Sequence, residues 1–585
     1  MKFLSNVLAV IVGLLVFWVL AFFIFAGIIA ISAGSAEVEI KENSLLHIRL
    51  NGVVLVERSP DEDLSLPPLP FVGTVSSVGI NQVIKAIETA QENEDIKGIY
   101  LESGLLGAGQ SHILEIRNAL KDFRESGKFI VAYGEYFTET GYFLCSVADE
   151  IYLNPIGDLE FNGFAATPVF FRGLLEKIEV EPVIFRVGEF KSAIEPFVLD
   201  KMSEENRLQT KAYLEDLNGI LIREVAESRS LAPETVQEIN NNMSVRANQD
   251  AVDLGLIDAL WYDDQVKARL REKLGLEEEA SINSINISGI NQTATEKNRL
   301  SRNQVAVIVA DGEIVGGEAP DQIGSEAFLK EIRKARKNKD VKAIVLRINS
   351  PGGSVVASEV IWRELSEAQK EKPLIASMSN YAASGGYYIA APADTIIAQP
   401  NTITGSIGIF GITFNAQGLL NNKLGITTDV VTTGTYSDFL NPTKSMSDME
   451  KAIMQSKVEE GYETFITRVA EGRTMSREDV MAIAGGRVWS GVAAKEIGLV
   501  DVLGGLDEAI RIAAAKAGLE EEFRVVYYPK QKSFLEQLME DFGNDVQGSY
   551  QRIKLGTSYE LYQTIERLKR MEGRMALMPF LMEID

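Results

Sequence analysis

Apolar residues in the second half of the chain form short continuous runs, and segments of mixed polarity separate these runs. The runs have the length of buried strands, and the mixed segments carry apolar residues at helical spacing. The predicted strands are residues 305–309, 343–348, 374–378 and 395–398, and the predicted helices are 326–338, 355–369 and a short helix from Ser384. Strands that are apolar on both faces and alternate with helices predict a mostly parallel sheet covered by helices on both sides.

A longer apolar run lies at the N-terminus. Residues 7–31 contain no charged or amide side chain, and about 20 helical residues are enough to cross the hydrocarbon core of a membrane. A cleavable signal peptide usually has an apolar core of only about 7–15 residues, so we expect residues 1–34 to form a retained transmembrane anchor. Lys2 precedes the run, and the positive-inside rule then places the rest of the chain on the outer side of the membrane.

The chain contains two copies of one sequence pattern. Residues 92–101 recur in diverged form at 337–346, and the Gly-Tyr pair at 141–142 recurs at the same shift at 386–387. The shift slips by only one residue further along, where Gly188 aligns with Gly434, and so small a drift indicates a duplicated domain. The predicted organisation is an anchor at 1–34, a first α/β repeat at 38–275, a polar linker at 276–303, a second α/β repeat at 304–525 and a helical C-terminal extension at 526–585.

Composition and charge remove several classes of function. The net charge of -25 argues against a large interface with nucleic acid, which would need clustered Lys and Arg. Cys145 is the single cysteine, so an intrachain disulfide and a cysteine-rich zinc site are excluded. Both histidines, His47 and His112, lie in the first copy. Any Ser-His-Asp triad in the second copy would have to borrow a histidine, and this scarcity favours lysine as a catalytic base.

The two copies differ where chemistry is expected. Ser384 of the second copy falls opposite Glu139 of the first, and Lys191 of the first copy falls opposite Ser437 of the second. One copy therefore has a candidate nucleophile without a base, and the other has a candidate base without a nucleophile. A single composite site shared between the repeats explains both differences.

Ser384 follows a predicted strand and a tight turn, and it opens a helix, so the amides after it point outward beside the positive end of the helix dipole. The turn at 350–354, Ser-Pro-Gly-Gly-Ser, follows a neighbouring strand. The amides of Gly353 and Gly385 could together stabilise the oxyanion of an acyl-transfer intermediate. The alternatives are a helix-capping serine beside an ordinary turn, or a phosphate cradle, although neither phosphate-loop motif fits this stretch.

Lys191 must be neutral to take a proton from the serine, which requires its pKa to fall from about 10.4 to about 7–8. Desolvation lowers the pKa of a lysine, and the apolar side chains within residues 188–197 could supply it. The alternative is an exposed lysine paired with Glu189 or Glu195. Ser406 could hydrogen-bond the amine and orient it, or it could serve only in a turn.

Four motifs, in this order, resemble the long form of the signal peptide peptidase A family, also called protease IV. They are Gly-Glu-Phe-Lys-Ser-Ala-Ile-Glu-Pro-Phe at 188–197, Ser-Pro-Gly-Gly-Ser at 350–354, Tyr-Ala-Ala-Ser-Gly-Gly-Tyr at 381–387 and Thr-Gly-Ser-Ile-Gly-Ile-Phe-Gly at 404–411. The resemblance covers nearly the whole chain. It implies duplicated Clp-protease/crotonase-like domains, with Ser384 as nucleophile, Lys191 as general base, Ser406 orienting the lysine, and the amides of Gly353 and Gly385 as oxyanion donors.

The resemblance also implies a setting for the enzyme. We expect a homotetramer, anchored in membrane lipid on the outer face of the bacterial cytoplasmic (inner) membrane, that needs no metal or cofactor. The implied substrates are signal-peptide remnants and similar peptides, cut after small or apolar residues.

Two other functions stay open at this point. A crotonase-like acyl-CoA enzyme would share the oxyanion hole, but it would not explain the anchor or the paired differences at Glu139 and Ser437. A catalytically inactive membrane scaffold would use Ser384 only as a helix cap.

Overall fold

The computed structural model describes residues 39–59, 76–294, 301–319, 322–520, 522–530 and 573–578, together with seven residues between positions 10 and 18. Most of the anchor predicted at residues 1–34 lies outside these described residues. Within the described part of the chain, no helix is both long enough and apolar enough to span a membrane.

The first repeat begins with two strands and ends with a strand and a helix. Its strands are β1 (Ser44–Arg49), β2 (Val53–Val56), β3 (Ser76–Gly79), β4 (Ile96–Glu102), β5 (Leu106–Gly107), β6 (Phe129–Gly134), β7 (Glu150–Leu153), β8 (Glu181–Val187), β9 (Ala259–Leu260) and β10 (Ser284–Asn286). Its helices are α2 (Ile80–Glu92), α3 (Gln110–Glu125), α4 (Glu139–Cys145), α5 (Arg172–Lys177), α6 (Glu195–Val198), α7 (Glu204–Arg229), α8 (Pro233–Asn241), α9 (Asn248–Asp253), α10 (Asp263–Leu274) and α11 (Ile287–Thr293).

The second repeat contains most of the remaining elements. Its strands are β11 (Gln304–Asp311), β12 (Ile314–Val315), β13 (Ile323–Gly324), β14 (Val341–Ser350), β15 (Gly352–Ser354), β16 (Leu374–Ala383), β17 (Thr395–Ala398), β18 (Ile403–Gly405), β19 (Ile409–Asn415), β20 (Val488–Ser490), β21 (Val502–Leu503), β22 (Arg524–Tyr528) and β23 (Gly573–Leu577). Its helices are α12 (Ser325–Lys337), α13 (Val355–Gln369), α14 (Gly385–Ala390), α15 (Asp448–Arg473), α16 (Arg477–Ile483), α17 (Gly491–Glu496) and α18 (Leu506–Lys516).

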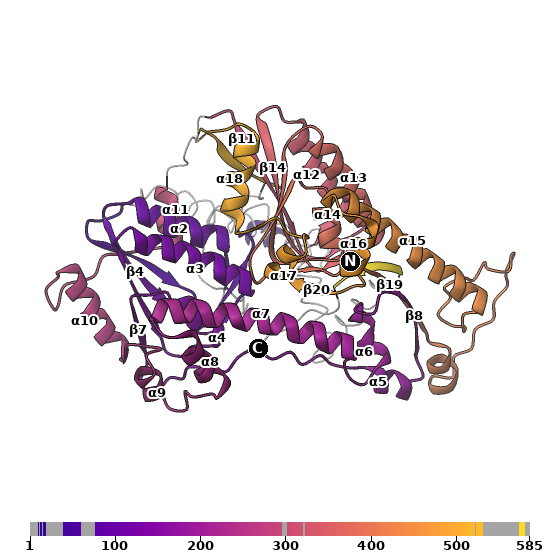
Figure 1. Ribbon diagram of the computed structural model, residues 1–585, viewed down its shortest axis with the longest axis horizontal. Coiled ribbons are helices and arrows are strands. Elements are labelled where there is room, and N and C mark those ends of the chain that lie inside the picture. The colour runs from indigo at the N-terminus through magenta and orange to yellow at the C-terminus, as the bar shows by residue number, and fades with distance from the viewer. Residues whose placement is uncertain are drawn as a thin grey trace.

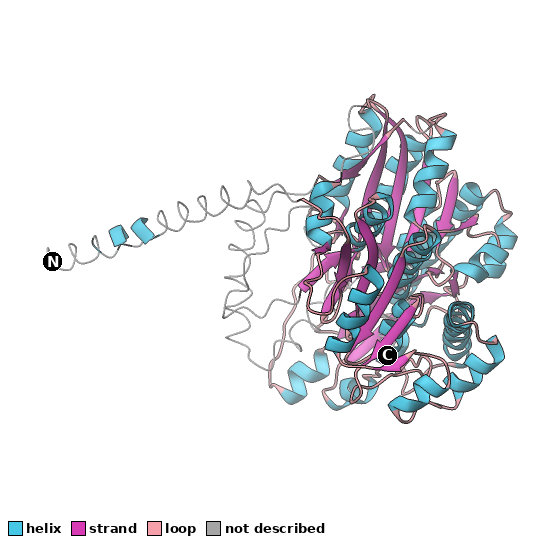
Figure 2. Ribbon diagram, turned by 90° about the vertical axis from the view of Figure 1, so that its left-hand side faces the viewer, coloured by secondary structure: helices cyan, strands magenta, loops and turns pink. Residues whose placement is uncertain are grey.

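The main sheets of the two repeats have the same strand order. The first sheet runs β10-β1-β4-β6-β7-β9, and every neighbouring pair is parallel. The second contains the matching path β22-β11-β14-β16-β17-β21, which is also parallel throughout. Helices flank the strands on both sides (Figure 2). The sequence therefore predicted correctly both the duplication and the mostly parallel sheets.

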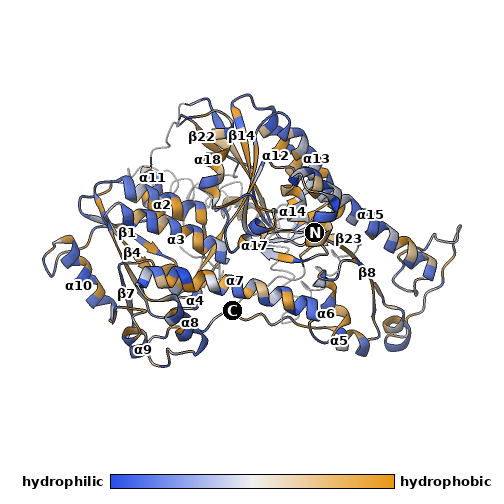
Figure 3. Cartoon of the chain, in the orientation of Figure 1, coloured by the Kyte–Doolittle hydropathy of each residue, from blue (hydrophilic) through white to orange (hydrophobic). Residues whose placement is uncertain are grey.

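Amphipathic patterning explains the helices that cover these sheets. On α12 the buried residues include Phe328, Ile332 and Ala335, at helical spacing, while the other face is charged. The strands they cover are apolar on both faces, as Ile344, Val345 and Leu346 of β14 are all buried. Figure 3 shows the resulting mixture of hydrophilic and hydrophobic residues along the helices.

Strand β16 is longer than the predicted strand at 374–378. It continues to Ala383 because residues 381–383 pair with β18. The extension begins with polar residues, so the pattern of apolar runs did not predict it as strand. They have buried partners, since the Ser379 hydroxyl accepts from Arg347 and the Asn380 side chain accepts from the Ser111 amide.

Two segments that were predicted to be a polar linker and a helical extension contain strands. Within 276–303, expected to be a polar linker, β10 pairs with β1 and α11 packs against α2. The polar residues there have structural uses, since Asn286 caps α11 by accepting from the amide of Gly289 at 2.7 Å. In the expected helical extension at 526–585, the described residues include the end of β22 and the whole of β23. Residues 531–572 lie outside the described residues.

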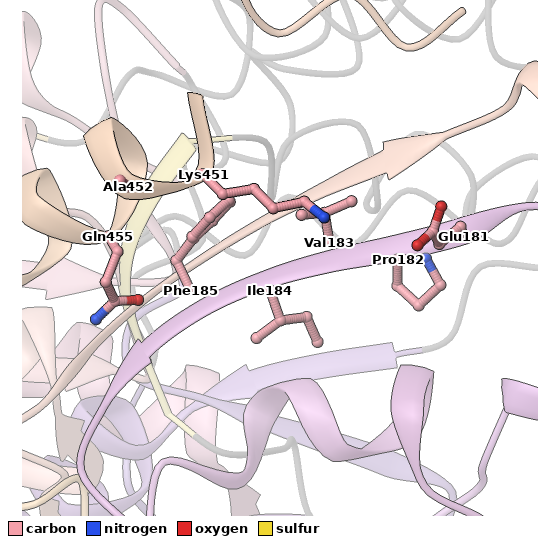
Figure 4. A pocket seen from close by; sticks show the side chains of 8 residues that line it. All are labelled: Glu181, Pro182, Val183, Ile184, Phe185, Lys451, Ala452 and Gln455. Carbon is pink, nitrogen blue, oxygen red and sulfur yellow. The ribbon is translucent and has the colours of Figure 1, made fainter. Parts of the chain in front are cut away.

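Strand β8 belongs to the first repeat but is built into the second. It pairs antiparallel with β19 from Glu181↔Asn415 to Val187↔Ile409, at the edge of a sheet ordered β13-β12-β15-β23-β19-β8. Figure 1 places β8, α5 and α6 beside the second repeat, and the long helix α7 leads back to the first. Val183 and Phe185 enter the core of the second repeat. In the close view of Figure 4, they lie on the side of β8 that faces α15, opposite Ile184.

A buried ion cluster joins the repeats at their main interface. Arg347 of β14 donates to Glu57 at 2.9 Å, and to both carboxylate oxygens of Glu115 at 2.9 Å each. The hydroxyls of Ser377 and Ser379 also accept from Arg347, each at 3.1 Å. Burial alone would raise the pKa of the Glu57 carboxyl, but the charges of Arg347 and of nearby His112 hold that pKa well below its usual range.

We predict that Arg347→Met destabilises the folded chain. The substitution leaves two buried carboxylates without their shared cation, and breaking a buried ion pair in this way typically costs about 3–5 kcal/mol. Urea unfolding followed by circular dichroism measures the loss. The matched control is Arg363→Met, which removes an exposed pair with Glu367 on α13 and should leave the urea midpoint nearly unchanged. Equal midpoints for the two variants would contradict a stabilising role for the cluster.

Candidate active site

Ser384 stands at the junction between β16 and α14 with an unusual backbone conformation. Its φ is 55° and its ψ is -113°, and a non-glycine residue held outside the common regions costs about 1–3 kcal/mol. The surrounding backbone fixes it, because its amide donates to the Gly405 carbonyl at 2.8 Å and its carbonyl accepts from the Tyr388 amide at 2.9 Å. The hydroxyl does not cap α14. It is free of the structural role that the helix-cap alternative would give it.

The structure brings Lys191 and Ser406 to this hydroxyl. The Nζ of Lys191 lies 2.8 Å from the Oγ of Ser384, 3.0 Å from the Oγ of Ser406 and 3.1 Å from the Ser406 carbonyl oxygen. All three residues are fully buried. Lys191 comes from the turn after β8, so the composite site depends on the strand that the first repeat contributes to the second.

A glycine pair in the second repeat makes room for the backbone around Lys191. A Cβ on Gly486 would lie 2.7 Å from both the Cβ and the backbone nitrogen of Lys191, so no other residue fits there without displacement. Gly485 accepts from the amide of Phe190 at 3.0 Å. Gln209 of α7 bridges the two repeats, because it donates to the Phe190 carbonyl and accepts from the Val488 amide, both at 3.1 Å.

Burial decides the protonation state of the lysine. Desolvation lowers the pKa of Lys191 well below its ordinary value of 10.5, and no charged neighbour is among the causes of the shift. The partners at its amine are the hydroxyls of Ser384 and Ser406 and a backbone carbonyl, none of which carries a charge that would hold the proton. The site therefore favours a neutral amine beside the Ser384 hydroxyl.

The two glycine turns predicted to supply oxyanion donors lie side by side. A Cβ on Gly352 would be 2.7 Å from the amide nitrogen of Gly385, so the turn after β14 touches the start of α14. Gly353 has a φ of 155° and begins the approach to α13. Its built Cβ would lie 2.0 Å from the Ile314 carbonyl oxygen. Only glycines allow the two turns to come this close to their neighbours.

The positions that align with Ser384 and Lys191 in the opposite repeat carry no equivalent groups. Glu139 occupies the start of α4, where it accepts from the Gly163 amide at 2.9 Å and from Asn240 at 2.8 Å. Burial raises the pKa of Glu139 to about 7, and these hydrogen bonds oppose the rise. Ser437, opposite Lys191 in the alignment of the copies, is exposed in a turn with Gly434. Within the described residues, these two counterpart positions therefore do not form a second pair of hydroxyl and amine.

Sequence reasoning missed the residues that shape the lysine turn. Gly485, Gly486 and Gln209 hold the backbone of residues 188–191, yet none of them was singled out. The Gly-Gly pair was a usable signal, since adjacent glycines before a strand indicate a close backbone approach. Nothing in the sequence around Gln209 distinguishes it from other polar residues of α7.

Two segments of the chain match one known protein family. Residues 122–277 and 366–520 both match peptidase family S49. The chain is 34% identical to Protease 4 of Salmonella typhi over 90% of its own length and 87% of that protein. It is 32% identical to Protease 4 of Haemophilus influenzae, over 82% of this chain and 80% of that one.

Two further proteins also show similarity to the chain. A protein of Arabidopsis thaliana named "Serine protease SPPA, chloroplastic" is 31% identical over 86% of this chain and 75% of its own. Among solved structures, a mutant ClpP1 of Listeria monocytogenes covers 35% of this chain and 94% of its own at 17% identity, with a TM-score of 0.25. That likeness is too slight to bear on the fold, so the Clp-protease/crotonase-like assignment stays a prediction.

The duplicated match and the length of the shared sequence lead to one conclusion. The chain belongs to peptidase family S49 and is a serine peptidase that carries the family domain twice.

Proposed function

We propose that this chain is a membrane-anchored serine endopeptidase in which Ser384 attacks the peptide carbonyl and Lys191 is the general base. The observation that carries the proposal is the 2.8 Å separation between Lys191 Nζ and Ser384 Oγ in a fully buried site. This distance is within the reach required for direct proton transfer. Membership of a peptidase family disfavours the acyl-CoA alternative, and the uncapped Ser384 hydroxyl disfavours the scaffold alternative.

Hydrogen-bond accounting supports a neutral lysine in this role. A neutral amine has two N–H donors and one lone pair. Ser406 offers two acceptors, its carbonyl oxygen and its Oγ, and the Ser406 hydroxyl directs its own proton to the Gly486 carbonyl at 3.2 Å. When both N–H groups donate to Ser406, the lone pair of Lys191 is left for the proton of Ser384.

The proposed reaction follows the general scheme of nucleophilic catalysis. Lys191 takes the proton of Ser384 as the hydroxyl attacks, and the protonated amine then gives a proton to the leaving amine. The amides of Gly353 and Gly385 stabilise the oxyanion, and a donor of this kind typically contributes about 3 kcal/mol to lowering the barrier. Water releases the acyl group from Ser384 in a second step.

We further propose that the substrates are signal-peptide remnants and similar apolar peptides. The four motifs that resemble the signal peptide peptidase A family support this assignment, as does an apolar cluster near the site. Phe197, Phe410 and Ile412 form one buried cluster beside the strands of the site. Small or apolar residues at the cleavage position are the expected preference.

The repeat geometry supports assembly of several copies into a homotetramer. The duplication shift relates β8 to residues 426–432, and it relates β19 to residues 164–170. Neither of these segments forms a strand in the described chain, and both are largely accessible. Val431 is 97% exposed, and Leu424 and Ile426 are also exposed.

One copy can therefore repeat the β8–β19 pairing with its neighbour. Residues 426–432 of one copy would lie against residues 164–170 of the next, in the antiparallel manner that β8 and β19 use within the chain. Such a head-to-tail contact uses two different surfaces, and it closes into a ring when the rotation between copies permits. Four copies and an anchor at residues 1–34, on the outer face of the bacterial inner membrane, complete the proposed assembly.

We predict that Ser384→Ala lowers kcat/KM for a fluorogenic peptide by about 10⁴-fold or more, because the nucleophile is lost. Lys191→Met should lower it by about 10²–10⁴-fold, the usual contribution of a general base. Lys451→Met, which removes an exposed lysine of α15, is the matched control and should retain activity. Circular dichroism verifies that each variant is folded, and full activity in either site variant would exclude the dyad.

The pH profile of kcat/KM tests the protonation state. Because burial lowers the pKa of Lys191 well below 10.5, activity should reach its plateau well below pH 10.5 and fall on the acid side as the amine becomes protonated. Between the lowered pKa of folded Lys191 and about pH 10.5, the unfolded chain holds the proton and the folded chain does not. The free energy of unfolding should therefore rise with pH over that range. Lys191→Met should lose that dependence. A rate that rises only near pH 10.5 would contradict a neutral base.

Light scattering on detergent-solubilised protein tests the assembly. The double variant Val430→Asp with Val431→Asp should lower the measured particle mass, because it places charge in the proposed contact between copies. Met481→Asp alters an exposed residue of α16 away from that segment and serves as the control. An unchanged mass in the double variant would show that residues 426–432 are not the contact.

A further inference from the structure

A cavity of about 510 Å³ lies where the two repeats meet, and none of the dyad residues lines it. The first repeat contributes residues 55–57, 106–109 and His112 to its walls, and the second contributes Asp311, Asn349 and residues 380–381. Tyr381 lies three positions before Ser384 at the end of β16, and three residues of an extended strand span about 10 Å. The cavity is therefore close to the candidate active site without being part of it.

The wall from the first repeat is the counterpart of the turn that carries a proposed oxyanion donor. The duplication shift relates residues 107–109 to 352–354. Strand β5 begins this wall and is the edge of the sheet ordered β3-β2-β5 among the described strands, whereas its counterpart β15 lies inside a larger sheet. Gly107 of β5 is exposed. An exposed strand edge of this kind can pair with the backbone of an extended peptide.

The cavity has acidic walls and no cation of its own. Glu57 and Asp311 line it, and no lysine or arginine is among the described residues that do so. Behind the wall, Arg347 supplies one positive charge to two carboxylates, Glu57 and Glu115. The Asp311 carboxylate accepts from the Asn349 amide at 2.9 Å and forms no ion pair within the described part of the chain. The charge in the cavity is therefore complementary to a cation.

The environment of Asp311 supports this complementarity. Protein surrounds its carboxyl on most sides, although the side chain stays accessible from the cavity. This desolvation raises the pKa of Asp311, and the charge of Glu57 raises it further, while Asn349, His112 and Arg347 oppose the rise. A cation that enters the cavity would relieve the repulsion between the two carboxylates.

His112 offers a further acceptor. The residue is only 3% exposed, and its Nε2 lies 2.8 Å from a carboxylate oxygen of Glu57. An ionised carboxylate only accepts, so in the neutral ring Nε2 carries the hydrogen and Nδ1 keeps a lone pair. That Nδ1 has no hydrogen-bond partner among the described residues. A buried acceptor without a donor is costly, and an N–H group of a ligand would satisfy it.

We infer that this cavity is a second, non-catalytic subsite that binds a lysine or arginine side chain of a substrate peptide whose backbone extends along β5. The cationic group donates to Asp311 and to Nδ1 of His112. Because Glu139 stands at the position of the serine in this repeat, the peptide is held here and not cut.

The inference rests on the proposed function and adds to it a means of recognising the substrate. A signal peptide has a positively charged segment before its apolar core. Ten extended residues span up to about 33 Å, so the basic end can lie in the cavity while the apolar part of the same peptide lies at Ser384. The subsite thus selects peptides that carry both parts.

Cleavage of a matched peptide pair tests the inference. Two fluorogenic peptides share one apolar core, and one begins with two lysines where the other has two glutamines. The wild-type chain should cleave the lysine peptide with a KM about tenfold lower, the usual contribution of a hydrogen bond to a charged group, and with a similar kcat. Asp311→Asn should abolish most of this preference, because it removes the charge and keeps the size of the side chain.

Asp340→Asn is the matched control. Asp340 is exposed at the opposite end of β14 from Asn349, and its substitution changes the net charge by the same single unit. This variant should keep the full preference. The chain has a net charge of -25, which attracts cationic peptides over its whole surface. Equal losses in the two variants would reveal only that general attraction and would overturn the inference.

The wild-type result separates the inference from the proposed function. Equal KM values for the two peptides would overturn the subsite and leave the peptidase assignment standing. A wild-type chain that cleaves neither peptide would overturn the proposed function itself.

A binding measurement tests the subsite without any catalysis. In the Ser384→Ala background, fluorescence anisotropy should give the labelled lysine peptide a dissociation constant about tenfold lower than that of the glutamine peptide. Asp311→Asn should remove the difference, and so should Asp311→Lys, which places a cation in the cavity. Circular dichroism verifies that each variant is folded. A difference that survives both substitutions would show that the lysines bind elsewhere.

Discussion

The pairing of β8 with β19 is the constraint on which the candidate site depends. Lys191 and Ser384 lie almost two hundred positions apart in the chain, and local structure alone cannot bring them together. The seven-residue antiparallel ladder fixes the direction and register of the chain entering the Lys191 turn. The glycine pair at 485–486 then lets the turn approach closely, and Gln209 ties it to the second repeat. The site is consequently as rigid as the contact between the repeats.

The interface between the repeats buries two cationic side chains in opposite ways. Arg347 keeps its charge, because Glu57 and Glu115 neutralise it and two serine hydroxyls complete its hydrogen bonds. Lys191 has no carboxylate partner among the described residues, and burial lowers the pKa of its amine well below the ordinary value. The difference follows from the cost of burying a charge, which is tolerated only when it is paired. One group joins the repeats and the other remains available for chemistry.

Much of this arrangement could be predicted from the sequence, for physical reasons. Apolar runs such as 395–398 and the helix at 355–369 matched the observed elements, because burial imposes their pattern on the residues. The contact between Lys191 and Ser384 could be anticipated because each copy lacks the group that the other copy carries. The end of β16, the insertion of β23 and the Arg347 cluster could not, since each depends on partners far away in the chain. Polar residues such as Ser379 look like a strand end until their buried partner is known.

The pairing of β8 with the second repeat also limits which substitutions could create a second site. Restoring a second site in the first repeat would need a serine in place of Glu139 and a lysine in place of Ser437. By the head-to-tail pairing proposed above, that lysine would arrive from another copy of the chain. Either replacement alone has no partner and gives no activity. A second site would therefore require both substitutions at once, one in each repeat.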